Sequence, residues 1–190
     1  MRRKLEAAVR HYELHRRSNL NDDLSKFGRG ELDPLKWAAG AYGKHLHQYH
    51  LKREDMKTAA DALRKRRREL NDAKDFEAIL KIVEEERVKG LGELYCYDTA
   101  LRIGATRNIS PEEVYLHRGT RTGAKKLNLS KPGQRSLPVS EVFEKFHALK
   151  RLEPHEIEDM LCIYKNFFLG KCSLSRCGSR GRGRTYSGRC

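Results

Sequence analysis

Apolar residues recur at the spacing of an α-helix from residue 5 to residue 168. Leu5, Ala8, Val9 and Tyr12 begin this pattern. Residues three or four positions apart lie on one face of a helix, so each such segment supplies one stripe for a core. We find no alternating pattern that predicts a pair of strands, and no internal repeat. The sequence therefore predicts an all-α fold, a multi-helix bundle.

Local signals place the expected helices. Asp33-Pro34 and Ser110-Pro111 are typical of helix starts, because a capping side chain precedes a proline in the first turn. Residues 18–30 and 120–137 are rich in Gly, Asn and Ser, which favours loops, the second with one helical turn near Gly123. Helices are expected over residues 5–17, 34–50, 54–70, 76 to the glycine turn at 90, 94–104, 110–119, 140–151 and 154–169.

The charge is strongly positive and uneven. The 190 residues include 40 Lys and Arg against 26 Asp and Glu, a net charge of +14, which favours a polyanionic partner. Residues 1–74 carry +8, residues 75–169 are neutral and residues 170–190 carry +6. We expect a basic helical N-terminal part (1–74), a core of the same domain (75–169) and a disordered Arg/Gly/Ser tail (170–190).

The cysteines and the hydropathy predict a cytoplasmic, reduced protein. Five cysteines are an odd number, and Cys96 and Cys162 fall in helical apolar patterns that are typical of buried thiols. We find neither a signal-peptide pattern nor an apolar run that approaches the roughly 18 residues of a membrane span. The sequence predicts no membrane partner and no catalytic or structural metal.

One short turn carries the main functional signal. Gly90-Leu91-Gly92 lies between the apolar stripes of residues 79–83 and 94–101. Two glycines leave the backbone amides without side-chain cover, and the start of the following helix adds free amides and a positive dipole end. Such a turn can hold one phosphate without contacting a base.

The segment from Ile79 to Gly104 resembles the helix-hairpin-helix motif of DNA-binding and repair proteins. Ile82 and Val83 before the turn, Gly90-Leu91-Gly92 as the hairpin, and Ala100 and Leu101 after it carry the resemblance. It implies non-sequence-specific binding of a DNA phosphate backbone at Lys89, Gly90, Leu91 and Gly92. It also implies a monovalent cation at the carbonyls of Gly90 and Gly92 as the single expected cofactor.

Basic residues elsewhere extend the expected interface. Residues 99–140 hold eight basic side chains but only two acidic ones, and a hydroxyl-rich loop in this segment can contact a second phosphate. A plain solvated loop is the alternative interpretation of this segment, whose candidate residues are Arg118, Thr120, Arg121, Thr122, Lys125 and Lys126. Auxiliary attraction is expected from Arg64, Arg66, Arg67 and Arg68, for which a solvated charged helix is the alternative interpretation.

The case for catalysis is weaker. The chain is distantly similar to helix-hairpin-helix DNA glycosylases, but Tyr115 stands where that family keeps a catalytic Asp, and the second helix lacks the nucleophilic Lys. Asp98, Tyr115 and His117 are the remaining candidates. We therefore expect nucleic-acid binding without catalysis, most simply to duplex DNA, with a divergent repair glycosylase or nuclease as one alternative.

A helical protein-interaction module is the other alternative. Such a module would expose an apolar stripe to a protein partner, and the sequence offers one candidate stripe in its last part. That stripe consists of Leu152, Ile157, Leu161 and Phe168.

Overall fold

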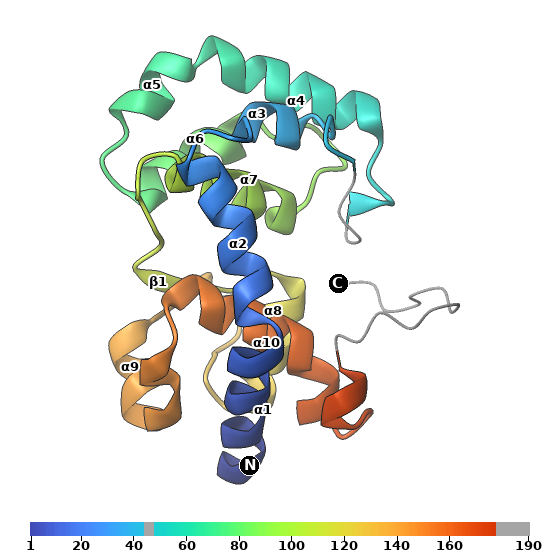
Figure 1. The fold of residues 1–190 in the computed structure, drawn as a ribbon, viewed down its shortest axis with the longest axis vertical. Coiled ribbons are helices and arrows are strands. Elements are labelled where there is room, and N and C mark those ends of the chain that lie inside the picture. Colours follow the sequence, from blue (N-terminus) through green and yellow to red (C-terminus); the bar gives the residue numbers. More distant parts are fainter. Residues whose placement is uncertain (44–47, 178–190) are drawn as a thin grey trace. The chain divides into compact units, whose positions relative to one another are not determined.

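The computed structural model describes residues 1–43 and 48–177, which are mainly helical (Figure 1), and the all-α prediction is confirmed. The chain forms two compact units. The terminal unit combines Met1–Leu20 with Glu112–Cys190, and the central unit is Asn21–Pro111. This division differs from the predicted one, which kept residues 1–74 together. The first twenty residues belong with the C-terminal part because their apolar side chains share its core.

The terminal unit is built around one long helix, α10 (Pro154–Phe168), whose start is fixed by a capping box between Glu153 and Glu156. Helices α1 and α8 and strand β1 all pack against α10. The other elements of this unit are α1 (Arg2–His15), the start of α2 (Arg17–Gly28), β1 (Glu113–Tyr115), α8 (Arg118–Lys126), β2 (Ser136–Pro138), α9 (Val139–Lys145), the 3-10 helix η2 (His147–Arg151) and the 3-10 turn η3 (Leu174–Arg176).

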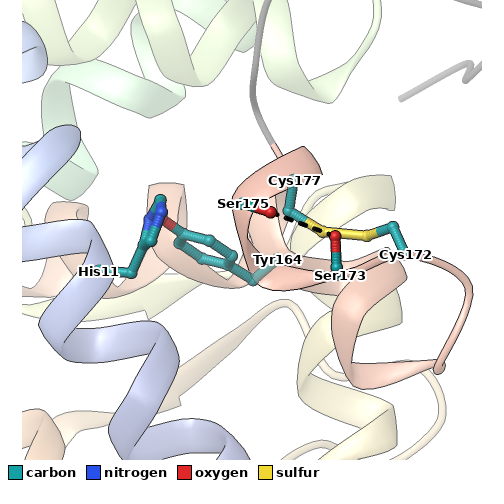
Figure 2. The surroundings of a disulfide bond; sticks show 6 residues. All are labelled: His11, Tyr164, Cys172, Ser173, Ser175 and Cys177. Carbon is teal, nitrogen blue, oxygen red and sulfur yellow. Dashed lines mark hydrogen bonds between the residues drawn. A yellow bond between two sulfur atoms is a disulfide. The ribbon is translucent and has the colours of Figure 1, made fainter.

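Polar contacts fix α1 to α10 beside the apolar core. The Nδ1 atom of His11 lies 2.7 Å from the Tyr164 hydroxyl, and Figure 2 shows this pair between the two helices. The Tyr12 hydroxyl donates to Asp159 at 3.1 Å. Apolar burial dominates the packing, since Leu5, Tyr12 and Tyr164 are among the residues with no exposed surface.

Strands β1 and β2 correct the sequence analysis, which predicted a helix from Ser110 and no strand pair. The two strands are antiparallel, with Val114 opposite Leu137. Both of these residues are buried while their neighbours are partly exposed, which is the alternation of a strand. Three residues are too few to show this alternation, and the partner lies more than twenty positions away.

The end of the terminal unit also differs from the prediction. Cys172 and Cys177 form a disulfide (Figure 2), so the expectation of a wholly reduced chain is wrong for this pair. Residues 170–177 were predicted to be disordered, but they include η3, and Cys177 is buried against the core. The rest of the predicted tail, residues 178–190, lies outside the described residues.

In its described residues the central unit contains the remaining part of α2 and five further α-helices. Helix α6 packs against α7, and α3 contacts both α4 and α7. Buried apolar side chains include Phe27, Trp37, Met56, Leu63 and Ile79. The five helices are α3 (Pro34–Ala38), α4 (Arg53–Lys65), α5 (Arg67–Asp72), α6 (Phe76–Glu85) and α7 (Glu93–Ala105).

Helix boundaries in this unit were predicted with mixed success. Residues 18–30, expected as a loop, lie largely in α2, since Phe27 is buried as a core contact. The helix expected over 34–50 ends at Ala38, two residues before Gly40 with a φ of 73°; residues 44–47 lie outside the described residues. The helix expected over 54–70 is interrupted at Arg66. Within the described ranges, no helix is long and apolar enough to span a membrane.

Candidate nucleic-acid interface

The predicted hairpin connects α6 and α7 in the central unit. Gly90 has a φ of 104°, a left-handed conformation that favours glycine, and the Leu91 amide donates to the Val88 carbonyl at 3.1 Å. Leu91 is buried, whereas Gly90 and Gly92 are exposed. The buried leucine therefore anchors the turn from inside and leaves the two glycines on the surface.

Gly92 is the N-cap of α7, which is 13 residues long. Its carbonyl accepts from the Tyr95 and Cys96 amides at 3.1 and 3.3 Å, while no side chain of the described residues caps this end. A Cβ added to Gly92 would meet nothing within 4 Å. The amides of the first two helical residues have no acceptor within the helix, so this end of α7 is suited to an anion.

The surroundings of the hairpin are not uniformly basic. Lys89 is exposed in the turn, but Glu93 occupies the first turn of α7. A Cβ placed on Gly90 would lie 3.4 Å from Oδ2 of Asp55, which belongs to α4. This carboxylate opposes an anion at the turn. No local pattern predicts it, because the contact joins segments that are 35 positions apart.

The predicted auxiliary arginines are largely engaged in ion pairs. Arg66 pairs with Glu69 and Glu85 at 2.6 and 2.7 Å and with Glu86 at 3.2 Å, and so it links the α4–α5 junction to the end of α6. Arg64 pairs with Asp61, and Arg68 lies 3.9 Å from Asp72. Arg67 is exposed on α5. The solvated-helix interpretation therefore fits these residues better, and Arg66 is a structural contact.

The second predicted contact region lies in the terminal unit, where α8 replaces most of the expected loop. Four of its six candidate residues are exposed on this helix and form one stripe without an acidic side chain. We call this the α8 stripe; it consists of Arg118, Thr122, Lys125 and Lys126.

The other two candidates on α8 face inward. Thr120 has no exposed surface, and its hydroxyl donates to Glu158 Oε1 at 2.6 Å, so its assignment to a phosphate contact is wrong. Arg121 is partly buried and donates to the Leu116 carbonyl, which places its guanidinium against its own unit. The stripe therefore excludes both residues.

Two glycines allow α8 to pack closely on α10. A Cβ on Gly119 would lie 2.5 Å from the Cys162 sulfur, and one on Gly123 would collide with the Leu161 carbonyl oxygen. The small residues four positions apart thus bring the two backbones together along one face. This close packing leaves the opposite face of α8, with its stripe, toward solvent.

Two of the three candidate catalytic residues, Asp98 and His117, contact other side chains of their own unit. Asp98 is four residues before Arg102, and the Asp98 Oδ1 to Arg102 Nη1 distance is 3.5 Å. Arg102 is buried, pairs with Asp23 at 2.7 Å and has its guanidinium carbon 3.7 Å from the centre of the Trp37 ring. Asp98 therefore belongs to a buried cluster that stabilises the central unit.

His117 and Tyr115 lie in the terminal unit. His117 is the N-cap residue of α8, and its buried ring contacts Glu158 of α10 and the Thr120 hydroxyl, the latter at 2.9 Å. Tyr115 is in strand β1 and is partly buried. The structure thus assigns these two residues and the hairpin to different units.

The charge is divided unequally between the units. By sequence, the terminal unit carries 22 basic and 10 acidic residues, whereas the central unit carries 18 and 16. The positive excess is therefore +12 in the unit with the α8 stripe and only +2 in the unit with the glycine hairpin. A division of the chain at residue 74 hides this difference, because the terminal unit joins both ends of the sequence.

No group of three or more His, Cys, Asp or Glu side chains in the described part of the chain is arranged to hold a metal ion. Comparisons with protein-family models, with curated proteins and with solved structures found no match to this chain. The apolar stripe predicted for a protein-interaction module is not an exposed surface. Its residues are all buried in the core of the terminal unit: Leu152, Ile157, Leu161 and Phe168.

Proposed function

We propose that the protein binds nucleic acid without recognising a base sequence, with duplex DNA as the expected partner. The observation that carries the proposal is the glycine hairpin, in which exposed Gly90 and Gly92 flank a buried Leu91 directly before the open end of α7. Backbone amides there can donate to one phosphate oxygen. A phosphate is common to every nucleotide, so this contact carries no sequence information.

The α8 stripe supports the proposal through charge. Arg118, Lys125 and Lys126 are exposed on one helix that has no acidic residue, within a unit of net charge +12. Each phosphate that such a side chain neutralises on duplex DNA steepens the log–log salt dependence of binding by about 0.9. The hairpin supplies a defined contact, and the terminal unit supplies salt-sensitive attraction.

The experiment that tests the hairpin compares two variants that add the same charge. Gly92→Asp fits the backbone, because Gly92 has a φ of −93° and nothing lies within 4 Å of its added Cβ. Aspartate is also a favourable N-cap, so the helix should remain folded while its carboxylate competes for the first-turn amides. Asn71→Asp places an equal charge on an exposed residue of α5.

Fluorescence anisotropy of a short labelled duplex measures the affinity of each protein. Gly92→Asp should weaken binding by about tenfold or more, because a hydrogen bond to a charged group contributes about 1.5–3 kcal/mol. Asn71→Asp should change affinity by no more than about twofold at moderate salt. Equal affinities of the two variants would contradict the hairpin contact, and absence of binding by the wild-type protein would contradict the proposed function.

A further inference from the structure

The central unit, which contains the glycine hairpin, also presents an aromatic ring to solvent. Tyr49 is 68% exposed, the largest fraction for any aromatic side chain in the described residues. The core of the unit therefore does not use this ring, and the phosphate contact proposed above does not use it either. A tyrosine ring in solvent has an apolar face that a ligand can cover.

The short turn that carries Tyr49 is anchored at both ends. The Leu51 amide donates to the Gln48 carbonyl at 2.9 Å and so closes a four-residue turn. Gln48 and Leu51 are buried, whereas Tyr49 and His50 between them are exposed. The buried residues hold the turn from inside and leave the tyrosine outside. A ring on an anchored turn loses less conformational entropy when a ligand binds than a ring on an unanchored segment.

The start of α4 connects this turn to the hairpin. Asp55 lies in the first turn of α4, and a Cβ on Gly90 would be 3.4 Å from its Oδ2. Tyr49 is six positions before Asp55, which limits the distance between their Cα atoms to about 22 Å. This length corresponds to about six steps along one DNA strand at about 3.4 Å per step. A strand with one phosphate at the hairpin can therefore place a nearby nucleotide at Tyr49.

The charges around Tyr49 suit the backbone of such a strand. Lys52 and Arg53 are exposed and follow the turn directly. Glu54 and Asp55 come next, in the first turn of α4, where Asp55 adjoins the hairpin. The two cations are thus on the tyrosine side of this segment, where they can contact the phosphates that flank a base on the ring. Basic side chains beside an aromatic ring are typical of sites for single-stranded nucleic acid.

We propose that Tyr49 is a stacking site for an unpaired base, so that the preferred ligand is a DNA duplex with a single-stranded overhang. Inside a duplex both faces of a base are covered by its neighbours, and only an unpaired nucleotide can place its base on the tyrosine. The hairpin holds a phosphate, and Tyr49 holds the base of a nucleotide further along. Every base has a face that can stack, so this contact selects no base sequence. The inference rests on the proposed function and adds the structure of its substrate.

The test compares two DNA ligands of equal charge. Both are the same duplex with a short overhang, which consists of thymidine nucleotides in one ligand and of abasic sugar phosphates in the other. Fluorescence anisotropy with the full-length protein should show about fivefold or tighter binding of the thymidine overhang, the lower end of the effect of one stacked base. Equal affinities for the two overhangs would overturn the inference and leave the phosphate contact standing. Absence of binding to both overhangs and to the blunt duplex would contradict the proposed function, and the inference with it.

Variants test whether Tyr49 supplies this preference, which is measured as the ratio of the two affinities. Tyr49→Ala should lower the ratio to about one, whereas Tyr49→Phe, which keeps the ring, should retain it. Tyr42→Ala is the matched control, because Tyr42 is the other exposed tyrosine of the described central unit and its hydroxyl accepts from the Asp33 amide. It should leave the ratio unchanged. A partly unfolded variant loses affinity for both ligands alike, so the ratio separates stacking from folding. An unchanged ratio in Tyr49→Ala, or an equal fall in Tyr42→Ala, would contradict the site.

Photochemical cross-linking locates the contact directly. Iodouracil in the overhang couples to an aromatic ring stacked on it when the complex is irradiated, and peptide mass spectrometry identifies the modified residue. The adduct should form on Tyr49 in the wild-type protein and should be lost in Tyr49→Ala. An adduct on another residue, or no adduct in a complex that forms, would contradict stacking at Tyr49.

Discussion

The central and terminal units differ in how they can meet an anion. The central unit presents bare backbone at Gly90 and Gly92 but carries a net charge of only +2, with Asp55 against the turn. The terminal unit carries +12 and presents side-chain charge on α8. A defined hydrogen-bonding geometry and a long-range attraction are thus properties of different parts of the chain.

The glycines of the two units show the same contrast. Gly92 has open space where a side chain would be, so packing does not require a glycine there. The absence of a side chain instead leaves the backbone exposed. Gly119 and Gly123 have no such space, so glycine is required at both positions for α8 to pack on α10. The same residue type therefore marks a candidate binding site in one unit and a structural contact in the other.

The largest expected effect concerns the buried cluster of the central unit. Arg102→Met would leave Asp23 and Asp98 without their cation and remove the contact with Trp37. Breaking a buried ion pair typically costs about 3–5 kcal/mol, and we expect a loss of this order in the free energy of unfolding. Urea denaturation measures it. A loss below about 1 kcal/mol, the range of surface pairs, would show that the cluster does not stabilise this unit.

The glycine contrast gives the next effect. Gly123→Ala should lower the free energy of unfolding by about 1–3 kcal/mol, because the added methyl collides with the Leu161 carbonyl. Gly92→Ser, whose Cβ meets nothing and whose hydroxyl is a favourable N-cap for α7, should stay within about 0.5 kcal/mol of the wild-type protein or be slightly more stable. Thermal unfolding of both variants under one condition makes the comparison. Similar losses would show that the two glycines do not differ in role.

Acidification should affect the terminal unit through its histidines. Burial lowers the pKa of His155 below its ordinary value of 6.5, and burial together with His15 and Arg16 lowers the pKa of His11. The unfolded chain then takes up a proton more readily than the folded one, so stability is present above pH 6.5 and is lost as the pH falls below it. Tm measured from pH 7.5 to 5.5 should decrease, and His155→Gln should reduce the slope. An unchanged slope would show that His155 does not contribute to the loss of stability at low pH.

The smallest expected effect concerns Asp55. Removing its negative charge in Asp55→Asn should raise the affinity for duplex DNA about two- to threefold, an electrostatic gain below 1 kcal/mol at a partly exposed site. Glu54→Gln is the matched control, because it lies beside Asp55 in the first turn of α4 and is exposed. Anisotropy titrations compare the two. An equal gain in both variants would show that the effect reflects net charge alone, with no special position for Asp55 at the hairpin.

Sequence analysis predicted what local patterns encode. The stripes of α6, α7 and α10 and the turn at Gly90–Gly92 follow from helical spacing, caps and glycine, and the structure contains all of them. It did not predict the β1–β2 pair, because three-residue strands acquire their partner only through the tertiary fold. The sequence also does not show which arginines are held in ion pairs within the protein. Arg66 and Arg67 are neighbours in the sequence, but three carboxylates pair with Arg66.

The sequence also predicted the position of the candidate site better than the orientation of its side chains. Residues 118–126 were identified as a basic segment, but whether Thr120 faces solvent or Glu158 depends on the packing of α8 against α10. The division of the chain after Leu20 and before Glu112 depends on contacts between the two ends of the sequence. Such long-range contacts leave no local pattern.

The central claim is that the hairpin supplies a defined contact and the α8 stripe supplies salt-dependent attraction. The most direct test is the log–log salt dependence of duplex binding. It is measured for the wild-type protein, for Gly92→Asp and for the double variant Lys125→Gln/Lys126→Gln. The double variant should have a slope shallower by up to about 1.8, because two phosphate contacts are lost. Gly92→Asp should bind more weakly at every salt concentration with a slope that differs by less than about 0.9, one ionic contact. Parallel, superimposed lines for all three proteins would contradict the account.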